Sequence, residues 1–468
     1  MSYANLRRIE FWLLLIGGLA WMDAGAGNGL VSLLLAALPG AAMLTAAIGF
    51  AMFPGVHGVA RTGALGALIG MLFAVPLLLA EPAVGLGLLA VSAAGFVACG
   101  LIGAEVVPVP PGLESPPRTA RLGAEVGADE AILAVASITM GTFAKGEQTR
   151  IASEVERALE CFEDQGWLKN PASFQEAPPG LETGEVDFRD ASVSRRPYEV
   201  MSFDSGFTPR QEVPGSQRYA GYAPCRRAYA WVLRGDENAP WLINVHGLGM
   251  GVPWLDFKLL QADLLRGLGL NLVFPVLPLH GPRALSAVSG RGYLTGELMD
   301  TIHAESQAIW DIRRIISWLW GQGVDRIGLH GVSLGGYTVS LVAALEEGLR
   351  CAVAGIPAVD PAWLLSWHSS ADARQACEVE GLTLENMTEV LRVISPLAMD
   401  PLVPGAHRYI YAGLADRFVP PVVVERLYEH WGQPKTHWYP GAHVTGVTHP
   451  GLIDFLTEAL QTSLLSSD

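Results

Sequence analysis

A serine, an aspartate and a histidine that could together perform acyl transfer occur in the C-terminal half of the sequence. Ser333 lies between Gly331 and Gly335 in a Gly-x-Ser-x-Gly pattern, and Asp416 and His443 follow it along the chain. A serine hydroxyl becomes a nucleophile when a histidine takes its proton and a buried carboxylate fixes the histidine tautomer. We therefore expect Ser333, Asp416 and His443 to form a catalytic triad.

The residues around Ser333 predict the tight strand–turn–helix unit that such a serine requires. A short apolar strand is expected at Arg326–His330 and a helix at Leu334–Glu347. The turn between them is so sharp that the residues two before and two after the serine must be small, and both are glycine. The first N–H groups of the helix would face the negative charge that develops in acyl transfer.

The acid and the base each follow a predicted strand. Arg408–Gly413 precedes Asp416, and Lys435–Tyr439 precedes His443, with a helix expected at Val422–Trp431 between them. The chain order serine, acid, histidine is the one that a strand–serine–helix hydrolase uses. The alternative role for Asp416 is a helix N-cap, which aspartate also favours.

Other residues compete for these two roles. His437, inside a predicted strand, and His449, before a proline at the start of the last helix, are the alternative bases. Asp400 and Asp454 are weaker alternatives for the acid.

An apolar strand at Trp241–His246 ends in His-Gly and a glycine-rich loop that could form an oxyanion hole. We expect one donor to be the N–H of Leu248, with Gly249 second, and the other to be the N–H of Leu334. His246 itself is expected to hold the loop by a hydrogen bond and not to act as a base.

Strands alternate with helices over the C-terminal two thirds of the chain, which predicts a mostly parallel sheet covered by helices on both faces. Ligands of such sheets collect at the carboxyl ends of the strands, where every candidate above lies. Further strands are expected at Arg227–Leu233, Leu270–Val276 and Arg350–Gly355, and further helices at Leu255–Leu268 and Leu298–Gly321.

Residues from about Asn170 to the C-terminus resemble the α/β-hydrolase superfamily. The resemblance rests on His246-Gly247, on the glycines around Ser333, on Asp416-Arg-Phe-Val-Pro and on Gly441-Ala-His443. Smaller details, Val245–Gly251, Leu277–Arg283 and Trp310-Asp-Ile-Arg-Arg, are similar to a bacterial branch whose members are mostly uncharacterised. The resemblance implies a serine hydrolase that forms an acyl-enzyme and needs no cofactor. Gly-Ala-His in place of the more usual Gly-Gly-His is the one departure.

Two segments are candidates for substrate binding. An insertion at about 357–405 occupies the place where this fold carries a lid, and its apolar residues could line a pocket or belong to the core: Trp363, Leu364, Leu365 and Trp367. The loop Leu277–Tyr293 holds His280, Arg283 and Arg291, which could steer an anionic group or simply be solvated.

The first 107 residues predict a transmembrane helical segment of about four spans. Only four charged residues occur between Phe11 and Val107. The apolar stretches are Phe11–Met22, Gly29–Phe53, Gly63–Ala80 and Ala83–Gly103. The first is short, and a cleaved signal peptide is its alternative reading. A buried soluble bundle is the alternative for the whole segment.

All the arginines that flank these spans fall on one side of a four-span arrangement, which places both termini and the catalytic domain in the cytoplasm. No ionisable residue lies in the middle of a span, so no transport pathway is indicated. Residues 108–181 are expected to form a Pro-rich linker and a helical collar, with helices at Asp129–Lys145 and Gln148–Gln165, and 182–468 the hydrolase domain.

The bulk composition excludes other classes of function. A net charge of −15 and an isoelectric point near 5.2 argue against nucleic-acid binding, which needs a basic surface. The five cysteines have no metal-ligand spacing and suggest free thiols in a reducing compartment. The sequence thus predicts a membrane-anchored serine hydrolase of carboxylic esters. Its location at a membrane indicates lipid-like substrates. The alternatives are an acyltransferase or thioesterase with the same triad, and a non-catalytic binding protein.

Overall fold

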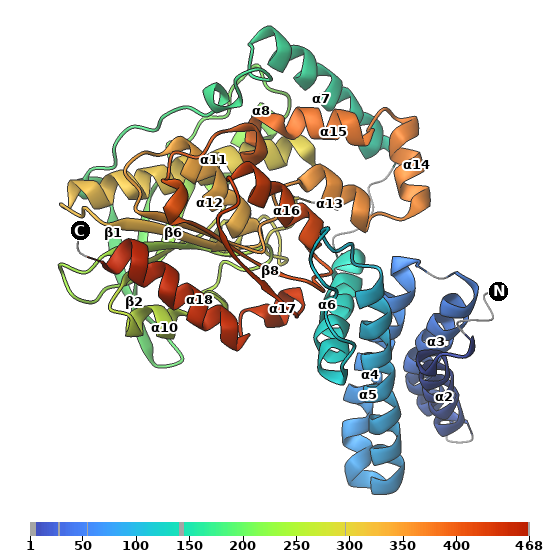
Figure 1. Ribbon diagram of the computed structural model, residues 1–468. Coiled ribbons are helices and arrows are strands. Elements are labelled where there is room, and N and C mark those ends of the chain that lie inside the picture. Colours follow the sequence, from blue (N-terminus) through green and yellow to red (C-terminus); the bar gives the residue numbers. More distant parts are fainter. Residues whose placement is uncertain (1–5, 27–28, 54, 140–144, 295, 467–468) are drawn as a thin grey trace. The chain divides into compact units, whose positions relative to one another are not determined.

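The computed structural model describes residues 6–26, 29–53, 55–139, 145–294, 296–466 (Figure 1). The chain divides into two compact units. The helical unit comprises the described part of residues 1–142 together with Gly413–Val422 and Trp438–His449. The sheet unit comprises Phe143–Ala412, Val423–His437 and Pro450–Asp468, again as far as they are described. The predicted boundaries at 107 and 181 stay predictions.

The sheet has nine strands in the order β1-β2-β3-β5-β4-β6-β7-β8-β9. The pairs β1–β2, β2–β3 and β3–β5 are antiparallel. The pairs β5–β4, β4–β6, β6–β7 and β7–β8 are parallel. The strands are β1 Asp187–Val193, β2 Arg196–Asp204, β3 Arg227–Leu233, β4 Trp241–Val245, β5 Asn271–Pro275, β6 Ile327–Val332, β7 Cys351–Gly355, β8 Arg408–Gly413 and β9 Lys435–Tyr439. The predicted fold class, the α/β-hydrolase fold, is confirmed.

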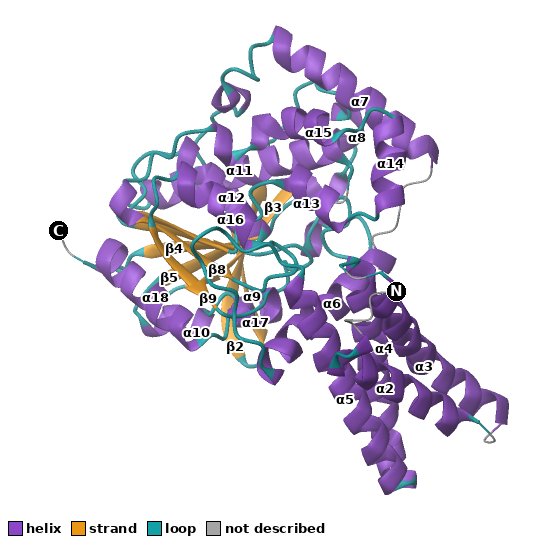
Figure 2. Ribbon diagram, turned by 45° about the vertical axis from the view of Figure 1, so that its right-hand side comes forward, coloured by secondary structure: helices purple, strands orange, loops and turns teal. Residues whose placement is uncertain are grey.

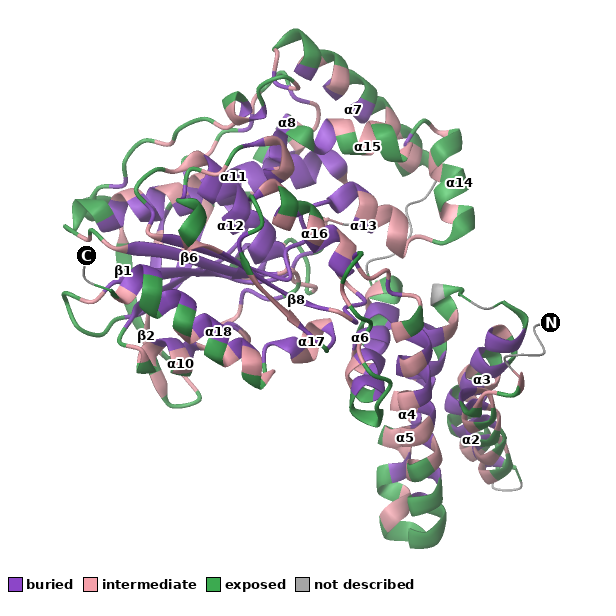
Figure 3. Ribbon diagram, in the orientation of Figure 1, coloured by how far each residue is buried: buried purple, intermediate pink, exposed green. Residues whose placement is uncertain are grey.

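Every residue of β4, β5, β6 and β7 is buried, as expected for apolar strands that are covered on both faces (Figure 3). Helices α10 (Ala262–Gly267) and α18 (Pro450–Leu460) cover one face, and α11 (Leu298–Gly321) and α12 (Leu334–Leu345) cover the other (Figures 1 and 2). The helix predicted at Leu255–Leu268 is in fact α9 (Pro253–Leu259) and α10. The two are separated where Gln261 takes a left-handed φ of 56°.

The hairpin of β1 and β2 was not predicted from the sequence. Most of β1 is exposed and polar, so it lacks the alternation that marks a half-buried strand. Its turn, Ser194-Arg195, has positive φ at both residues, the geometry of a two-residue hairpin loop, but without the usual asparagine or glycine.

The insertion at about 357–405, predicted as a lid, is helical and packs within the sheet unit. It contains α13 (Pro361–His368), α14 (Ala371–Val379) and α15 (Leu384–Val390). Helix α7 (Lys145–Asp164), predicted as part of a collar, shares one apolar core with α11 and with this insertion. Other short elements are α8 (Ser216–Ala220), α16 (Pro421–His430), several 3₁₀ turns and the π-helical turn Gln461–Leu465.

The helical unit contains α2 (Ile9–Gly25), α3 (Gly29–Met52), α4 (His57–Ala80), α5 (Pro82–Glu105) and α6 (Ala120–Thr139), with the short α17 (His443–Gly446). Among the residues that the structure describes, three helices are long and apolar enough to cross a membrane, over Ser32–Met52, Gly58–Ala80 and Pro82–Glu105. Helix α2 has 17 residues and falls short of that length. The first span and the orientation therefore stay predictions.

Helix α6 begins nine residues before the predicted start at Asp129 because its early glycines are contact points and not helix breakers. A Cβ on Gly100 of α5 would lie 1.8 Å from the carbonyl oxygen of Gly123 of α6. A Cβ on Gly127 would lie 2.9 Å from the carbonyl oxygen of Phe96. Small residues thus let the two helix backbones approach closely.

This contact predicts opposite effects for two Gly→Ala changes on α5. Gly100→Ala is expected to lower the stability of the helical unit by about 1–3 kcal/mol because the methyl group overpacks the helix contact. Gly87→Ala, with nothing within 4 Å of its Cβ, should be neutral or stabilising by up to about 1 kcal/mol through helix propensity. Thermal melts of the detergent-solubilised protein measure both. A Gly100→Ala protein that melts at or above the Gly87→Ala protein contradicts the packing.

Candidate active site

The backbone of Ser333 has the strained geometry expected of a nucleophile at a sharp turn. Ser333 joins β6 to α12 with φ 60° and ψ −116°, a region that residues other than glycine rarely occupy. The conformation is held from both sides: the Ser333 N–H donates to the carbonyl of Gly355 at 2.8 Å, and its carbonyl accepts from Tyr337 at 3.0 Å. Strain of this kind persists only where the surrounding structure imposes it.

The glycines around Ser333 are required by the space available. A Cβ on Gly331 would lie 2.3 Å from the carbonyl oxygen of Gly335, and one on Gly335 would lie 2.0 Å from that of Val245. A Cβ on Gly336 would lie 2.6 Å from the carbonyl oxygen of Gly355. The expectation that small residues must flank the serine is therefore confirmed, and Gly336 is a third such position.

The predicted oxyanion loop lies beside the serine, within the sheet unit. A Cβ on Gly247 would be 3.5 Å from Cβ of Ser333. Within the described ranges, the N–H groups of Leu248 and Leu334 donate to no other group. Free N–H groups on both sides of a serine are what an oxyanion hole requires. Gly249 has a left-handed φ of 80°, so the loop turns sharply just after Leu248.

His246 holds this loop, as predicted. Its Nδ1 lies 2.8 Å from the carbonyl oxygen of Gly247, and its Nε2 accepts the Leu277 N–H at 3.1 Å. Burial lowers the pKa of His246, so the ring stays neutral and can keep both bonds. On the far side of the loop, the Gly251 N–H donates to Asp256 at 3.0 Å.

The predicted acid and base are paired within the helical unit. Oδ2 of Asp416 lies 2.7 Å from Nδ1 of His443. Oδ1 of Asp416 accepts the N–H groups of Phe418 and Val419 at 2.8 and 2.7 Å. Asp416 is completely buried, whereas the His443 side chain keeps 11% of its exposure. Asp416 therefore closes its own loop and orients the histidine, and it does not cap α16, which begins at Pro421.

A second carboxylate, Asp129 of α6, lies at the same histidine and was not predicted. It accepts backbone N–H groups of His443 at 2.9 Å, Val444 at 3.1 Å and Arg417 at 3.2 Å. Burial and the neighbouring Asp416 raise the pKa of Asp129 to about 7. The sequence signal was a pair of adjacent acids, Asp129 and Glu130, in a helix whose other charged residues are Arg121 and Glu125.

The charges around His443 favour its protonated form. Burial acts to lower the pKa of His443, but the charge and hydrogen bond of Asp416, with the charge of Asp129, outweigh burial and raise it. The ring of Phe418 stacks on the imidazole, with centroids 4.7 Å apart. A histidine in this setting accepts a proton readily and holds a fixed tautomer.

The competing residues have other positions. Asp400 and Asp454 are exposed, so neither is a buried acid. His437 stacks on Phe455, and His449 stacks on Tyr439.

A buried polar chain crosses the sheet directly beneath the serine turn, and it too was not predicted. His330 of β6 bonds Oδ1 of Asn244 in β4 at 2.7 Å and the hydroxyl of Tyr411 in β8 at 3.0 Å. The Tyr411 ring passes over Gly355 of β7, where a Cβ would lie 2.1 Å from it. Burial lowers the pKa of His330 to about 4, so the ring is neutral at pH 7.

The residues predicted to bind substrate differ in their burial and contacts. Trp363 and Trp367 stack on each other, with centroids 5.1 Å apart. Arg283 is buried and forms an ion pair with Asp311 at 2.8 Å, so it neither steers a substrate nor lies in solvent. Arg291 is exposed.

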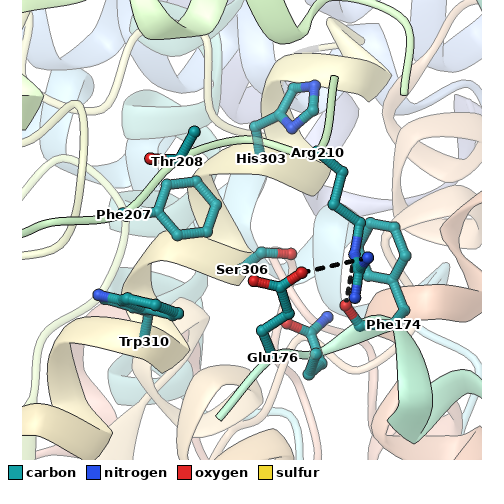
Figure 4. A pocket seen from close by; sticks show the side chains of 9 residues that line it. Phe174, Glu176, Phe207, Thr208, Arg210, His303, Ser306 and Trp310 are labelled. Carbon is teal, nitrogen blue, oxygen red and sulfur yellow. Dashed lines mark hydrogen bonds and ion pairs between the residues drawn. The ribbon is translucent and has the colours of Figure 1, made fainter. Parts of the chain in front are cut away.

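The pocket in Figure 4 lies elsewhere in the sheet unit, around Phe207, His303 and Trp310. Its volume of about 20 Å³ suits roughly one water molecule. It is therefore a gap in the packing and too small for a substrate.

Searches against known proteins find relatives of unknown activity. Two Mycobacterium tuberculosis proteins, the uncharacterized proteins Rv2627c and MT2702, are each 44% identical over 317 residues, or 67% of this chain and 76% of theirs. No family model matches. Among solved structures, acetyl xylan esterase 1 of Thermoanaerobacterium sp. JW/SL YS485 is 17% identical with a TM-score of 0.43, covering 63% of this chain and 93% of that one. The acetyl xylan esterase of Paenibacillus sp. R4 is 15% identical with a TM-score of 0.44, covering 64% and 94%.

The neutral His330 predicts a specific pH dependence of stability. Because its folded-state pKa of about 4 lies below the ordinary 6.5, the unfolded chain binds the proton first. The neutral His330 ring therefore contributes fully to the free energy of unfolding above pH 6.5, and this contribution is lost as the pH falls toward 4. Between pH 7 and pH 5 the native protein should lose roughly 2 kcal/mol more stability than His330→Gln, which cannot titrate.

Denaturant unfolding at both pH values measures this difference, and His407→Gln is the matched control for loss of a histidine. Equal losses in the native protein and in His330→Gln would contradict the buried neutral assignment.

Proposed function

The chain belongs to the same family as the two uncharacterized mycobacterial proteins and has the α/β-hydrolase fold, and from this premise we propose that it is a membrane-anchored serine hydrolase of carboxylic esters. The observation that carries the proposal is the backbone of Ser333, held at φ 60° between β6 and α12 with two free N–H groups beside it. Backbone strain at a serine that is flanked by free N–H groups is the arrangement that nucleophilic acyl transfer requires, which supports the proposal.

The proposed reaction has two stages. His443 takes the proton of the Ser333 hydroxyl as the serine oxygen attacks the ester carbonyl, and Asp416 stabilises the imidazolium that forms. The N–H groups of Leu248 and Leu334 hold the negative oxygen of the tetrahedral intermediate. His443 then gives its proton to the departing alcohol, which leaves an acyl group on Ser333. Water, activated by the same histidine, releases the acid and restores the serine.

The composition of the helical unit supports a membrane location. Helices α3, α4 and α5 are long and apolar enough to cross a bilayer. The arginines that flank them favour a cytoplasmic catalytic domain. An enzyme held at a bilayer meets amphipathic substrates at high local concentration, so we propose a lipid-like ester as the substrate class.

Two alternatives remain distinguishable by experiment. An acyltransferase or thioesterase would use the same triad but transfer the acyl group to an added alcohol, or cleave a thioester in preference to an ester. A non-catalytic binding protein on the same fold would form no covalent adduct at Ser333. Product analysis with alcohol and thiol acceptors separates the first alternative, and covalent labelling separates the second.

The serine mechanism predicts selective labelling by a fluorophosphonate probe. Membranes that contain the native protein should be labelled, and Ser333→Ala should lose the label and more than 99% of ester hydrolysis, because no other group replaces the nucleophile. Ser192→Ala, an exposed serine on β1, is the matched control and should keep both.

A p-nitrophenyl ester series of increasing acyl length then tests the substrate class. Rates that rise with chain length support a lipid-like ester. Full hydrolysis by Ser333→Ala would refute the mechanism altogether.

A further inference from the structure

We propose that Asp129 on α6 is a positioning residue of the active site, through which the N-terminal helices hold the loops that carry the acid and the base. This inference rests on the proposed hydrolase function and deepens it. The N-terminal segment would then be a working part of the catalytic apparatus and more than a membrane anchor.

One carboxylate ties together the two loops that follow β8 and β9. Oδ2 of Asp129 accepts the N–H of Arg417, next to the acid, and the N–H of His443 itself. Oδ1 accepts the N–H of Val444. Asp129 is completely buried, so these three bonds replace its hydration. Loss of this carboxylate would leave three backbone donors without a partner at the base of the imidazole.

The neighbouring side chain holds the same loop a second time. Nε of Arg417 donates to Oε1 of Glu130 at 2.5 Å, and both side chains are completely buried. Nε of Arg61, on α4, lies 3.8 Å from the other oxygen of Glu130. The acid loop is therefore bound through its backbone by Asp129 and through a side chain by Glu130.

Helix α6 is in turn fixed to the candidate membrane helices. The close contacts of Gly123 and Gly127 place it directly on α5. Apolar side chains of α6 also pack against the loops, since Leu122 and Val126 form one buried cluster with Ala415 and Ala442. A continuous set of contacts thus leads from the apolar helices to the residues beside Asp416 and His443.

The carboxyl of Asp129, whose pKa is about 7, is mostly ionised above pH 7, where its charge adds to that of Asp416 at the imidazole. These two carboxylates face His443 from α6 and from the loop after β8. Behind them, Glu130, Arg417 and Arg61 form the ion-paired set described above, and the uncharged ring of Phe418 covers the face of the imidazole. Glu125, also on α6, lies near Gly441 and pairs with Arg121. A residue that only held the loops in place would not change the pKa of His443. A carboxylate at this position should raise that pKa.

The experiment compares the native protein with Asp129→Asn in ester hydrolysis from pH 5 to pH 9. The asparagine amide presents N–H groups to backbone donors, and the negative charge is lost. We expect kcat to fall at least 10-fold with KM changed less than twofold. The acid limb of the pH–rate profile should move to lower pH by a few tenths of a unit or more, because a neutral neighbour favours the imidazolium less.

Two further variants make the outcome decisive. Asp129→Glu keeps the charge but displaces the carboxylate, so it should lose kcat and keep the native acid limb. Asp325→Asn, an exposed aspartate of the sheet unit, is the matched control and should leave kcat and the limb unchanged. Thermal melts show whether each variant is folded, so an unfolded Asp129→Asn is recognised and the Glu variant then decides.

The results separate this inference from the proposed function. A native protein that takes no fluorophosphonate label refutes the hydrolase proposal itself. A labelled native protein whose Asp129→Asn or Asp129→Glu variant keeps the native kcat overturns the role of Asp129 alone. If kcat falls but the acid limb of the pH–rate profile is the same in the Asn and Glu variants, Asp129 only holds the loops in place. That result also overturns the inference.

Discussion

The backbone conformation of Ser333 is the constraint on which most of the sheet unit depends. A residue with a side chain at φ 60° and ψ −116° is costly, and it is held there by hydrogen bonds to β7 and to α12. The same turn brings strand and helix so close that Gly331 and Gly335 cannot carry a Cβ. Beneath it, the His330 chain of hydrogen bonds joins three strands. The sheet thus bears backbone strain at one serine, which is only partly buried.

The acid–histidine pair follows a different physical logic, which is electrostatic. Asp416 is buried and fully hydrogen-bonded, so its charge acts on the imidazole with little screening from water. Asp129 places a second carboxylate at the same ring and ties its backbone. The two halves of the proposed site therefore make different demands on the chain: the serine needs steric precision, and the histidine needs buried charge.

These demands explain what could be predicted from the sequence. Ser333, Asp416 and His443 were predicted because each follows a strand that could be recognised in the sequence and because their order is that of the fold. The close packing around the serine can be read from the sequence, because it requires glycine at fixed positions before and after Ser333. Tyr411 left no such signal in the sequence and Asp129 left only a pair of adjacent acids, because their partners lie far along the chain and only folding brings them together. The β1–β2 hairpin was missed for another reason: its first strand is mostly polar and exposed, and its turn lacks glycine.

The central claim is that Ser333 carries the acyl group during turnover, and trapping that intermediate tests it most directly. The native protein is mixed with a slowly hydrolysed p-nitrophenyl ester, quenched in acid within the first turnovers and digested with trypsin. The account predicts that the peptide Ile327–Arg350 gains the mass of one acyl group and that fragmentation places it on Ser333. Turnover with an unmodified peptide, or with the acyl group on another residue, would contradict it.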